Sequence, residues 1–356
     1  LKKTETPHGV RFELYHDGVK VSSLLVFDYR LTYNTAQLRM AGIAGLVTAE
    51  EYRNRGFASQ LMRETIDWMA EEKYDCSFLF GIPNYYWRYG YATVLTHATT
   101  TVKLEPVDSE GFLIRELREE DLPAVRLLYN QNNLNRMCSL IRPERWQGFP
   151  RGSEWRVKPA CFVVESEEGS IEGYAVYDAE AEDLMVSEVE TGDPRAQYAV
   201  LQGLYEIGAA RKVDEFKFLG ATNHPFAVFC RRFGAVHQDT VQRYAFGMAR
   251  LIDIVSFFES TAPELSRRAW LLREGPARTI KFQTDIGSCS LEVSRGVVRV
   301  TDSDAPPAAV INCSQLELTR LVFGVVDYQT FSVSSGTSVE GDGELLSILY
   351  PTQLNT

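Results

Sequence analysis

The chain has 356 residues, of which 45% are hydrophobic and 24% charged, a composition typical of a globular protein with two or three domains. With 37 basic and 48 acidic residues its net charge is -11, which argues against nucleic acid as a partner. The same negative field favours cationic small molecules, and no apolar run is long enough to cross a membrane.

Cysteine and histidine spacing gives no support for a metal site. The six cysteines have no C-x-x-C spacing, and the five histidines form no H-x-x-x-H pair. We therefore expect no metal, reduced thiols and a cytoplasmic location, with no visible signal peptide. The first residue is Leu1 rather than Met, so we expect that the native N-terminal part is missing.

In chain order, the first predicted elements are strands. Residues 9–28 alternate around the turn at Asp17 and Gly18, and residues 37–47 continue as a further strand. This strand ends in the apolar residues Leu46 and Val47, followed by Thr48.

An R-x-x-G-x-A pattern follows, formed by Arg53, Arg55, Gly56 and Ala58 where an amphipathic helix begins. Free backbone N–H groups and the positive end of the helix dipole suit a diphosphate at this point. A glycine lets the backbone approach the phosphates closely, and the two arginines add counter-charge. We call residues 53–59 the diphosphate clamp. The alternative interpretation is an ordinary strand-to-helix turn with a solvated basic face.

A second segment, residues 76–92, combines a predicted strand over 77–82, a break at Pro83 and Asn84, and the pattern Y-x-R-Y-G-Y that starts at Tyr86. A tyrosine with a pKa near ~10 can donate a proton while staying neutral at pH 7. The alternative is that the aromatic residues of this segment only pack under the helix.

These two segments together resemble the GNAT N-acetyltransferases. The resemblance implies that the first segment binds coenzyme A and that Tyr86 protonates the departing thiolate. The cofactor-binding residues expected from it are Leu46, Val47, Thr48, Arg53, Asn54, Arg55, Gly56, Phe57, Ala58, Ser59 and Asn84.

Residues 109–249 are expected to form a second GNAT-like domain after a catalytic domain over residues 1–108. An Arg-aromatic-Gly ending recurs at residues 231–234, but Asp193 and Pro194 occupy the place of the clamp. A diphosphate there would meet negative charge and fewer amides, so we predict a domain without catalytic function.

Residues 250–356 are expected to form the third domain. A helix from residue 248 through Phe258, strands over 278–284, 288–293 and 297–300, and helices over 316–323 and 343–349 resemble sterol-carrier-type domains. Such a fold encloses either a ligand cavity or a packed core, and the sequence does not distinguish them.

The order of domains over nearly the whole chain resembles the enhanced-intracellular-survival (Eis-like) acetyltransferases. The resemblance implies transfer of acetyl from acetyl-CoA to amines, aminoglycosides among them, hexameric assembly, and a general base at the carboxylate of the last residue, here Thr356. Family members end in a longer tail with an aromatic residue, so Glu50 or Glu51 acting through water stays an alternative base.

We therefore expect an α+β protein with mixed sheets that transfers acetyl directly from acetyl-CoA to an amine of an aminoglycoside-like or polyamine-like molecule. The alternatives are a protein-lysine acetyltransferase and a non-catalytic protein that binds apolar ligands or lipids. A Cys76 nucleophile is disfavoured because this cysteine starts an apolar strand with no nearby histidine.

Overall fold

The computed structural model describes residues 1–7, 9–109, 111–144, 149–152, 157–302 and 306–353. The chain divides into two compact units. Unit 1 holds the described residues within 1–95, 135–140 and 242–355, and unit 2 holds those within 96–134 and 141–241. The mixed helix and strand content confirms the predicted fold class.

The first sheet of unit 1 has eight strands, in the order β1-β2-β3-β4-β5-β15-β6 with β9 paired to β3. The strands are β1 (Lys2–Thr6), β2 (Gly9–His16), β3 (Val19–Tyr33), β4 (Ala36–Thr48), β5 (Cys76–Gly81), β6 (Ala92–Thr93), β9 (Met137–Leu140) and β15 (Phe246–Leu251). The strands predicted over residues 9–28, 37–47 and 77–82 are thereby confirmed.

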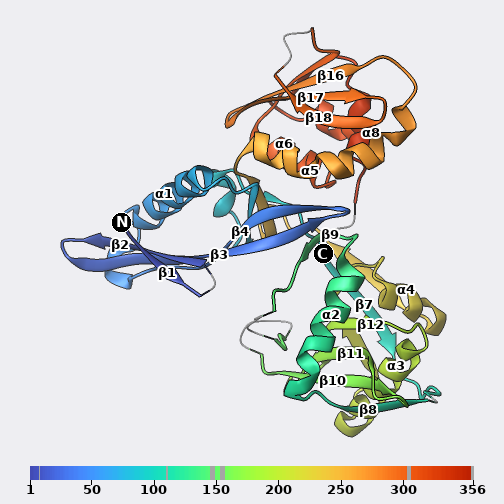
Figure 1. Cartoon of the computed structure of the whole chain (residues 1–356). Coiled ribbons are helices and arrows are strands. Elements are labelled where there is room, and N and C mark those ends of the chain that lie inside the picture. The colour runs from blue at the N-terminus through green and yellow to red at the C-terminus, as the bar shows by residue number, and fades with distance from the viewer. Residues whose placement is uncertain (8, 110, 145–148, 153–156, 303–305, 354–356) are drawn as a thin grey trace. The chain divides into compact units, whose positions relative to one another are not determined.

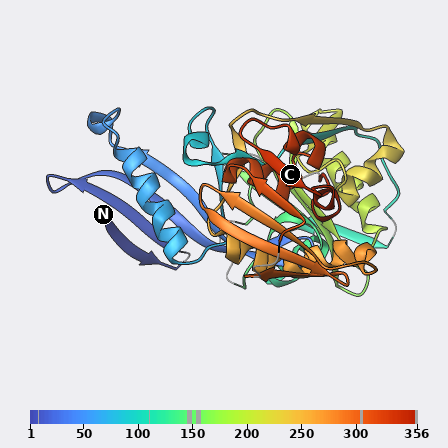
Figure 2. The same cartoon turned by 90° about the horizontal axis from the view of Figure 1, so that it is seen from above.

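Helix α1 (Phe57–Glu71) lies along one face of this sheet, as Figures 1 and 2 show. Its side chains Leu61 and Met62 are buried against Val26, Ala41 and Leu79 of the strands. Because successive strand residues point to opposite faces, the neighbours of these three strand residues face away from α1.

Strands β4 and β5 run parallel, but their pairing ends early. The paired residues run from Met40 and Cys76 to Gly42 and Phe78, although β4 continues to Thr48. The last six residues of β4 therefore diverge from β5, and a split opens in the sheet beyond Gly42.

Strand β15 corrects one prediction from the sequence. We predicted a helix starting at residue 248, but residues 246–251 form a strand that pairs antiparallel with β5 and with β6. The helix begins later, with α5 (Ile254–Ala269), where Asp253 accepts hydrogen bonds from the N–H groups of Val255 and Ser256. Tertiary pairing with β5 overrides the local pattern at residues 246–251.

The rest of unit 1 is an α+β layer with a five-stranded sheet in the order β18-β17-β16-β19-β20. Its elements are α5, β16 (Arg278–Thr284), β17 (Gly287–Ser294), β18 (Val297–Thr301), β19 (Ala309–Asn312), α6 (Gln315–Val322), α7 (Tyr328–Ser332), β20 (Ser338–Gly341) and α8 (Leu345–Leu349). The predicted strands and helices of this region are present, whereas its assignment to the sterol-carrier type stays a prediction.

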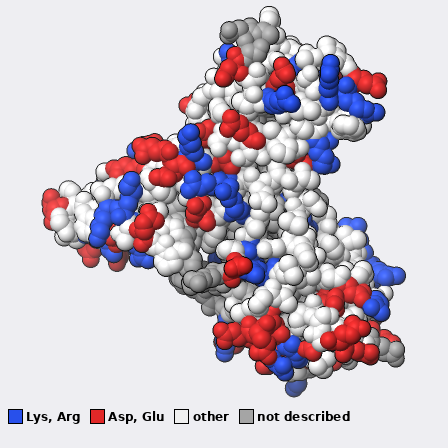
Figure 3. Space-filling view, viewed as in Figure 1, with Lys and Arg blue, Asp and Glu red and all other residues white. Residues whose placement is uncertain are grey.

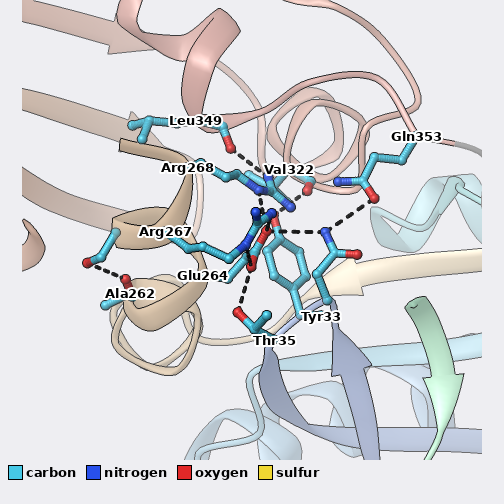
Figure 4. Close-up of polar contacts among 11 residues, drawn as sticks. Tyr33, Thr35, Ala262, Glu264, Arg267, Arg268, Val322, Leu349 and Gln353 are labelled. Atoms are coloured by element: carbon cyan, nitrogen blue, oxygen red, sulfur yellow. Dashed lines mark hydrogen bonds and ion pairs between the residues drawn. The ribbon is translucent and has the colours of Figure 1, made fainter. Parts of the chain in front are cut away.

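A buried cluster of polar side chains joins the β3–β4 turn to α5 (Figure 4). Glu264 has no exposed surface and accepts hydrogen bonds from Thr35 (2.6 Å), Arg267 (2.8 Å) and Arg268 (2.7 Å). Burial raises the pKa of Glu264, but these hydrogen bonds outweigh it and lower the pKa to about 2. The buried carboxylate is therefore charged and paired at neutral pH.

Unit 2 contains a seven-stranded sheet in the order β14-β7-β13-β12-β11-β10-β8. Its elements are β7 (His97–Lys103), β8 (Phe112–Glu116), α2 (Leu122–Asn133), β10 (Pro159–Ser166), β11 (Ile171–Asp178), β12 (Leu184–Thr191), α3 (Ala196–Arg211), β13 (Glu215–Phe218), α4 (Pro225–Cys230) and β14 (Val236–Thr240). Its parallel pair β12–β13 followed by a short helix repeats the pattern of β4 and β5 in unit 1.

Two strands cross the predicted domain boundaries. Strand β7 precedes residue 108 but pairs with β13 in the sheet of unit 2, and β15 precedes residue 250 for most of its length but pairs with β5 in unit 1. In the predicted division into residues 1–108, 109–249 and 250–356, β7 belongs to the first range and most of β15 to the second. The division into three domains stays a prediction.

Charges of both signs are interspersed over β1 to β4 and α1 on the face shown in Figure 3. In the part of the chain that the structure describes, no helix is both long and apolar enough to span a membrane.

Candidate active site

The diphosphate clamp lies between β4 and α1. Gly56 is the N-cap of α1 with φ of 87°, and no side chain caps the helix among the described residues. The first intrahelical bond runs from the N–H of Gln60 to the carbonyl of Gly56 at 2.9 Å. The amides of Phe57, Ala58 and Ser59 therefore stand at the open end of the helix, as an anion site requires.

Both clamp arginines are exposed. Arg53 lies 4.0 Å from the Glu50 carboxylate and donates weakly to the Thr48 carbonyl at 3.4 Å. The guanidinium of Arg55 lies over the rings of Tyr52 and Phe57, at 5.2 and 5.4 Å. Asn54 precedes it with φ of 60°, which turns the backbone sharply into the clamp.

The three predicted residues at the end of β4 lie in the divergent part of the strand. On the β3 side, the Val47 carbonyl and the Thr48 hydroxyl contact Ser22 Oγ at 2.8 and 3.1 Å. On the β5 side, Leu46, Val47 and Thr48 have no ladder partner within the described chain. An extended chain bearing amides can pair with such an edge.

The second predicted segment forms a 3-10 helix over Tyr86–Tyr89, and we call residues 84–91 the tyrosine segment. Tyr89 Oη donates to Ser59 Oγ at 2.8 Å, which ties this segment to the first turn of α1. The structure thus brings together the clamp and the tyrosine segment, which are separate in the sequence.

Tyr86 is half-buried and packs on the α1 side of the sheet. Its ring lies 4.9 Å from that of Tyr85 and 6.3 Å from that of Tyr91. A side chain at Gly81 would come within 2.8 Å of the Tyr86 ring, so this glycine makes room for it. Burial, with a smaller effect of Tyr89, raises the pKa of Tyr86, which keeps the phenol protonated at neutral pH.

Both backbone polar groups of Asn84 are hydrogen-bonded within the protein. Its N–H donates to the Tyr244 carbonyl at 3.0 Å, and its carbonyl accepts from Arg88 at 3.2 Å. Its exposed side chain is the group left for a ligand.

Thr356 lies outside the described residues. The last residue described, Gln353, accepts a hydrogen bond of 3.4 Å from Asn34 at the β3–β4 turn. The role of the Thr356 carboxylate as a general base stays a prediction.

The thiols do not offer a nucleophile. All six cysteines are free, and Cys76 is fully buried, with its pKa raised well above the ordinary value by burial. Within the described ranges, no group of three His, Cys, Asp or Glu residues is placed to hold a metal ion.

Comparison with known families assigns the first part of the chain. Residues 8–94 match the family described as "Acetyltransferase (GNAT) domain". The chain contains a GNAT acetyltransferase domain. This domain is that of an acetyl-CoA-dependent N-acyltransferase, as predicted from the two motifs. The comparison with curated proteins finds no match.

Solved structures show the same fold over nearly the whole chain. A probable N-acyltransferase from Enterococcus faecalis V583 has a TM-score of 0.72 at 19% identity, covering 97% of this chain and 87% of its own. A GCN5-related N-acetyltransferase from Kribbella flavida has a TM-score of 0.71 at 19% identity, with 98% and 86% covered. Eis1 from Mycobacterium abscessus has a TM-score of 0.63 at 17% identity, with 98% and 90% covered. The predicted Eis-like fold is confirmed.

Unit 2 has a different helix start at the place that corresponds to the clamp. Asp193 accepts a hydrogen bond of 2.8 Å from the N–H of Arg195 and pairs with its guanidinium at 2.6 Å. A carboxylate thus occupies the start of α3, where the GNAT domain of unit 1 has an open helix end. The assignment of a second GNAT-like domain without a clamp stays a prediction.

Several residues that shape the tyrosine segment were not among the predicted site residues. Gly81 lies under the Tyr86 ring, and Arg250 and Gln315 donate to the carbonyls of Tyr89 and Gly90. Arg250 and Gln315 lie more than 150 residues from these partners in the sequence, and no local pattern marks them.

Proposed function

We propose that this protein transfers the acetyl group of acetyl-CoA directly to an amine at the split between β4 and β5. The observation that carries the proposal is the common location of the uncapped α1 N-terminus and Tyr86, which the 2.8 Å bond from Tyr89 to Ser59 links. The clamp would bind the diphosphate, and the free edge of β4 would pair with the pantetheine amides.

In this proposal Tyr86 is the general acid. It donates its proton to the sulfur of coenzyme A as the C–S bond breaks and the amine nitrogen bonds to the acetyl carbon. The proton that the amine loses passes to water, and the Tyr86 phenolate regains a proton from water before the next turnover. The raised pKa of Tyr86 keeps that proton available at neutral pH. No covalent enzyme intermediate is needed.

The acceptor would approach from the sheet face opposite α1. The α1 side is filled by the helix and by the tyrosine segment. On the other face Phe27 and Tyr29 stack at 5.3 Å beside Gly42, and Phe80 is 70% exposed next to Phe246. The ring faces of these residues suit an organic cation, by cation–π attraction.

The acceptor class proposed from the net charge of -11 is a cationic small molecule of aminoglycoside or polyamine type. A protein lysine carries the same reactive group and stays an alternative acceptor. Glu50 and Glu51 lie at the clamp, and Glu50 is 85% exposed, so either would act as a base only through water. Hexameric assembly, a cytoplasmic location and the base at Thr356 stay proposals from the resemblance.

A role in lipid binding has less support. A cavity among Leu272, Pro276, Arg278, Val293 and Leu345 of the C-terminal layer has a volume of about 30 Å³. Ligand pockets usually hold ~300 Å³ or more. Phe257, Phe258 and Phe282 are among the large buried side chains that fill the core of this layer.

The test is thiol release from acetyl-CoA in the presence of a polyamine, an aminoglycoside, a lysine peptide and an arylalkylamine. Release that depends on an acceptor supports the proposal and identifies the acceptor class. A melting temperature that acetyl-CoA leaves unchanged, together with no thiol release, would contradict it.

A further inference from the structure

We infer that Gln315 of the C-terminal layer is a positioning residue for the general acid Tyr86, so that this layer takes part in catalysis through the tyrosine segment. The inference rests on the proposed function of Tyr86. From the sequence, the C-terminal layer could either bind a ligand or serve only as a scaffold. A contact with the tyrosine segment gives this layer a role in catalysis.

The carbonyl groups at the end of the tyrosine segment are held by two donors. Gln315 Nε2 donates to the Gly90 carbonyl at 2.5 Å, and Arg250 Nη1 donates to the Tyr89 carbonyl at 2.7 Å. The same short turn bonds back to the general acid, because the Tyr91 N–H donates to the Tyr86 carbonyl at 3.4 Å. The position of the Tyr86 backbone therefore depends on this end of the segment.

Both the backbone and the side chain of Gln315 are hydrogen-bonded within the protein. It is 1% exposed and is the first residue of α6, and its N–H donates to Asp285 at 2.6 Å. Its backbone carbonyl and Oε1 lie 2.7 and 3.2 Å from the Thr319 hydroxyl. With its amide oxygen facing a donor, the amide nitrogen is directed at Gly90.

The second donor, Arg250, is half-buried, and its Nε is buried without a partner among the described residues. Burial lowers the pKa of Arg250, while the neighbouring Tyr91, Asp285 and Asp67 oppose that shift. Removing a cation from water is costly unless the cation is paired or hydrogen-bonded, and the bond from Arg250 Nη1 to the Tyr89 carbonyl is such a hydrogen bond.

Gly90 fits between the two donors because it lacks a side chain. Its φ is 79°, and a Cβ there would lie 2.1 Å from Arg250 Nη1 and 2.2 Å from Gln315 Nε2. In unit 2, Gly234 ends the related Arg-aromatic-Gly turn with φ of 76°, but no described atom lies within 4 Å of its Cβ position. The close approach of two donors is therefore specific to the turn that carries Tyr86.

The experiment is a double-mutant cycle between Gln315→Met and Tyr86→Phe, with kcat and the KM for acetyl-CoA measured in the full chain. Methionine keeps the length of the side chain and removes the donor. We expect Gln315→Met to lower kcat about 10-fold with KM for acetyl-CoA changed less than about twofold, and to have almost no effect on kcat in the Tyr86→Phe background.

Ser314→Ala is the matched control. It removes the N-cap bond to Glu317 at 3.2 Å and so weakens the same helix without touching Gly90. An equal loss of kcat in Ser314→Ala, an unchanged kcat in Gln315→Met, or an equal loss with and without Tyr86 would each overturn the inference. If Tyr86→Phe alone leaves kcat unchanged, it is the proposed acid that fails.

Discussion

Tyr89 Oη donates a hydrogen bond of 2.8 Å to Ser59 Oγ, which fixes the tyrosine segment to the first turn of α1. Ser59 is the third residue of the helix whose open end forms the diphosphate clamp. The bond therefore fixes the separation between the diphosphate clamp, which is proposed to bind the cofactor, and Tyr86, which is proposed to protonate it. Proton transfer requires such a fixed separation.

Gly56→Asp is expected to abolish binding of acetyl-CoA, because the new carboxylate would face the diphosphate at the start of α1. The change also strains a residue with φ of 87°. Gly234→Asp in unit 2 is the control, since Gly234 has φ of 76° and open space around it. Calorimetric titration with acetyl-CoA measures the effect, and normal affinity in Gly56→Asp would show that the clamp is not the binding site.

Tyr86→Phe is expected to lower kcat by very roughly 10²-fold with little change in the affinity for acetyl-CoA, the scale of one acid–base group. Tyr85→Phe removes the hydroxyl of the adjacent ring, 4.9 Å away, and serves as the control. Equal rates in Tyr86→Phe and the unmodified protein would remove this phenol from the mechanism.

Phe80→Ala is expected to raise the KM for the acceptor about fivefold, because a ring bordering the acceptor path is lost, while acetyl-CoA binding stays unchanged. Phe80 is 70% exposed, so the free energy of unfolding should change little. Leu271→Ala, at a side chain that is 80% exposed in the C-terminal layer, is the control. An unchanged acceptor KM in Phe80→Ala would place the acceptor elsewhere.

Glu264→Gln is expected to lower the melting temperature most at neutral pH. The folded-state pKa of Glu264 is lowered to about 2 from 4.5, so its contribution is present above pH 4.5 and is lost as the pH falls from there toward 2. The difference in melting temperature between the two proteins should therefore shrink over that range. A difference that is independent of pH would show that the charge of Glu264 does not stabilise the fold.

Local patterns were enough to predict the helix start after Gly56, the aromatic turn that begins at Tyr86 and most strands of unit 1, whereas the binding of a cofactor there stays a proposal. These features form between residues that are close in the sequence: a strand-to-helix turn, a glycine at the N-cap and a short aromatic turn. The spacing of the residues is therefore enough to predict them. The same holds for the acidic residue before α3 in unit 2, where Asp193 and Pro194 precede the helix.

Long-range pairing was not readable from local patterns. Residues 246–251 have an apolar pattern that suits a helix or a strand, and their pairing with β5 decides between the two. The donors Arg250 and Gln315 became visible only with the tertiary structure, because every residue carries a backbone carbonyl and an accepting carbonyl does not identify a donor far away in the sequence.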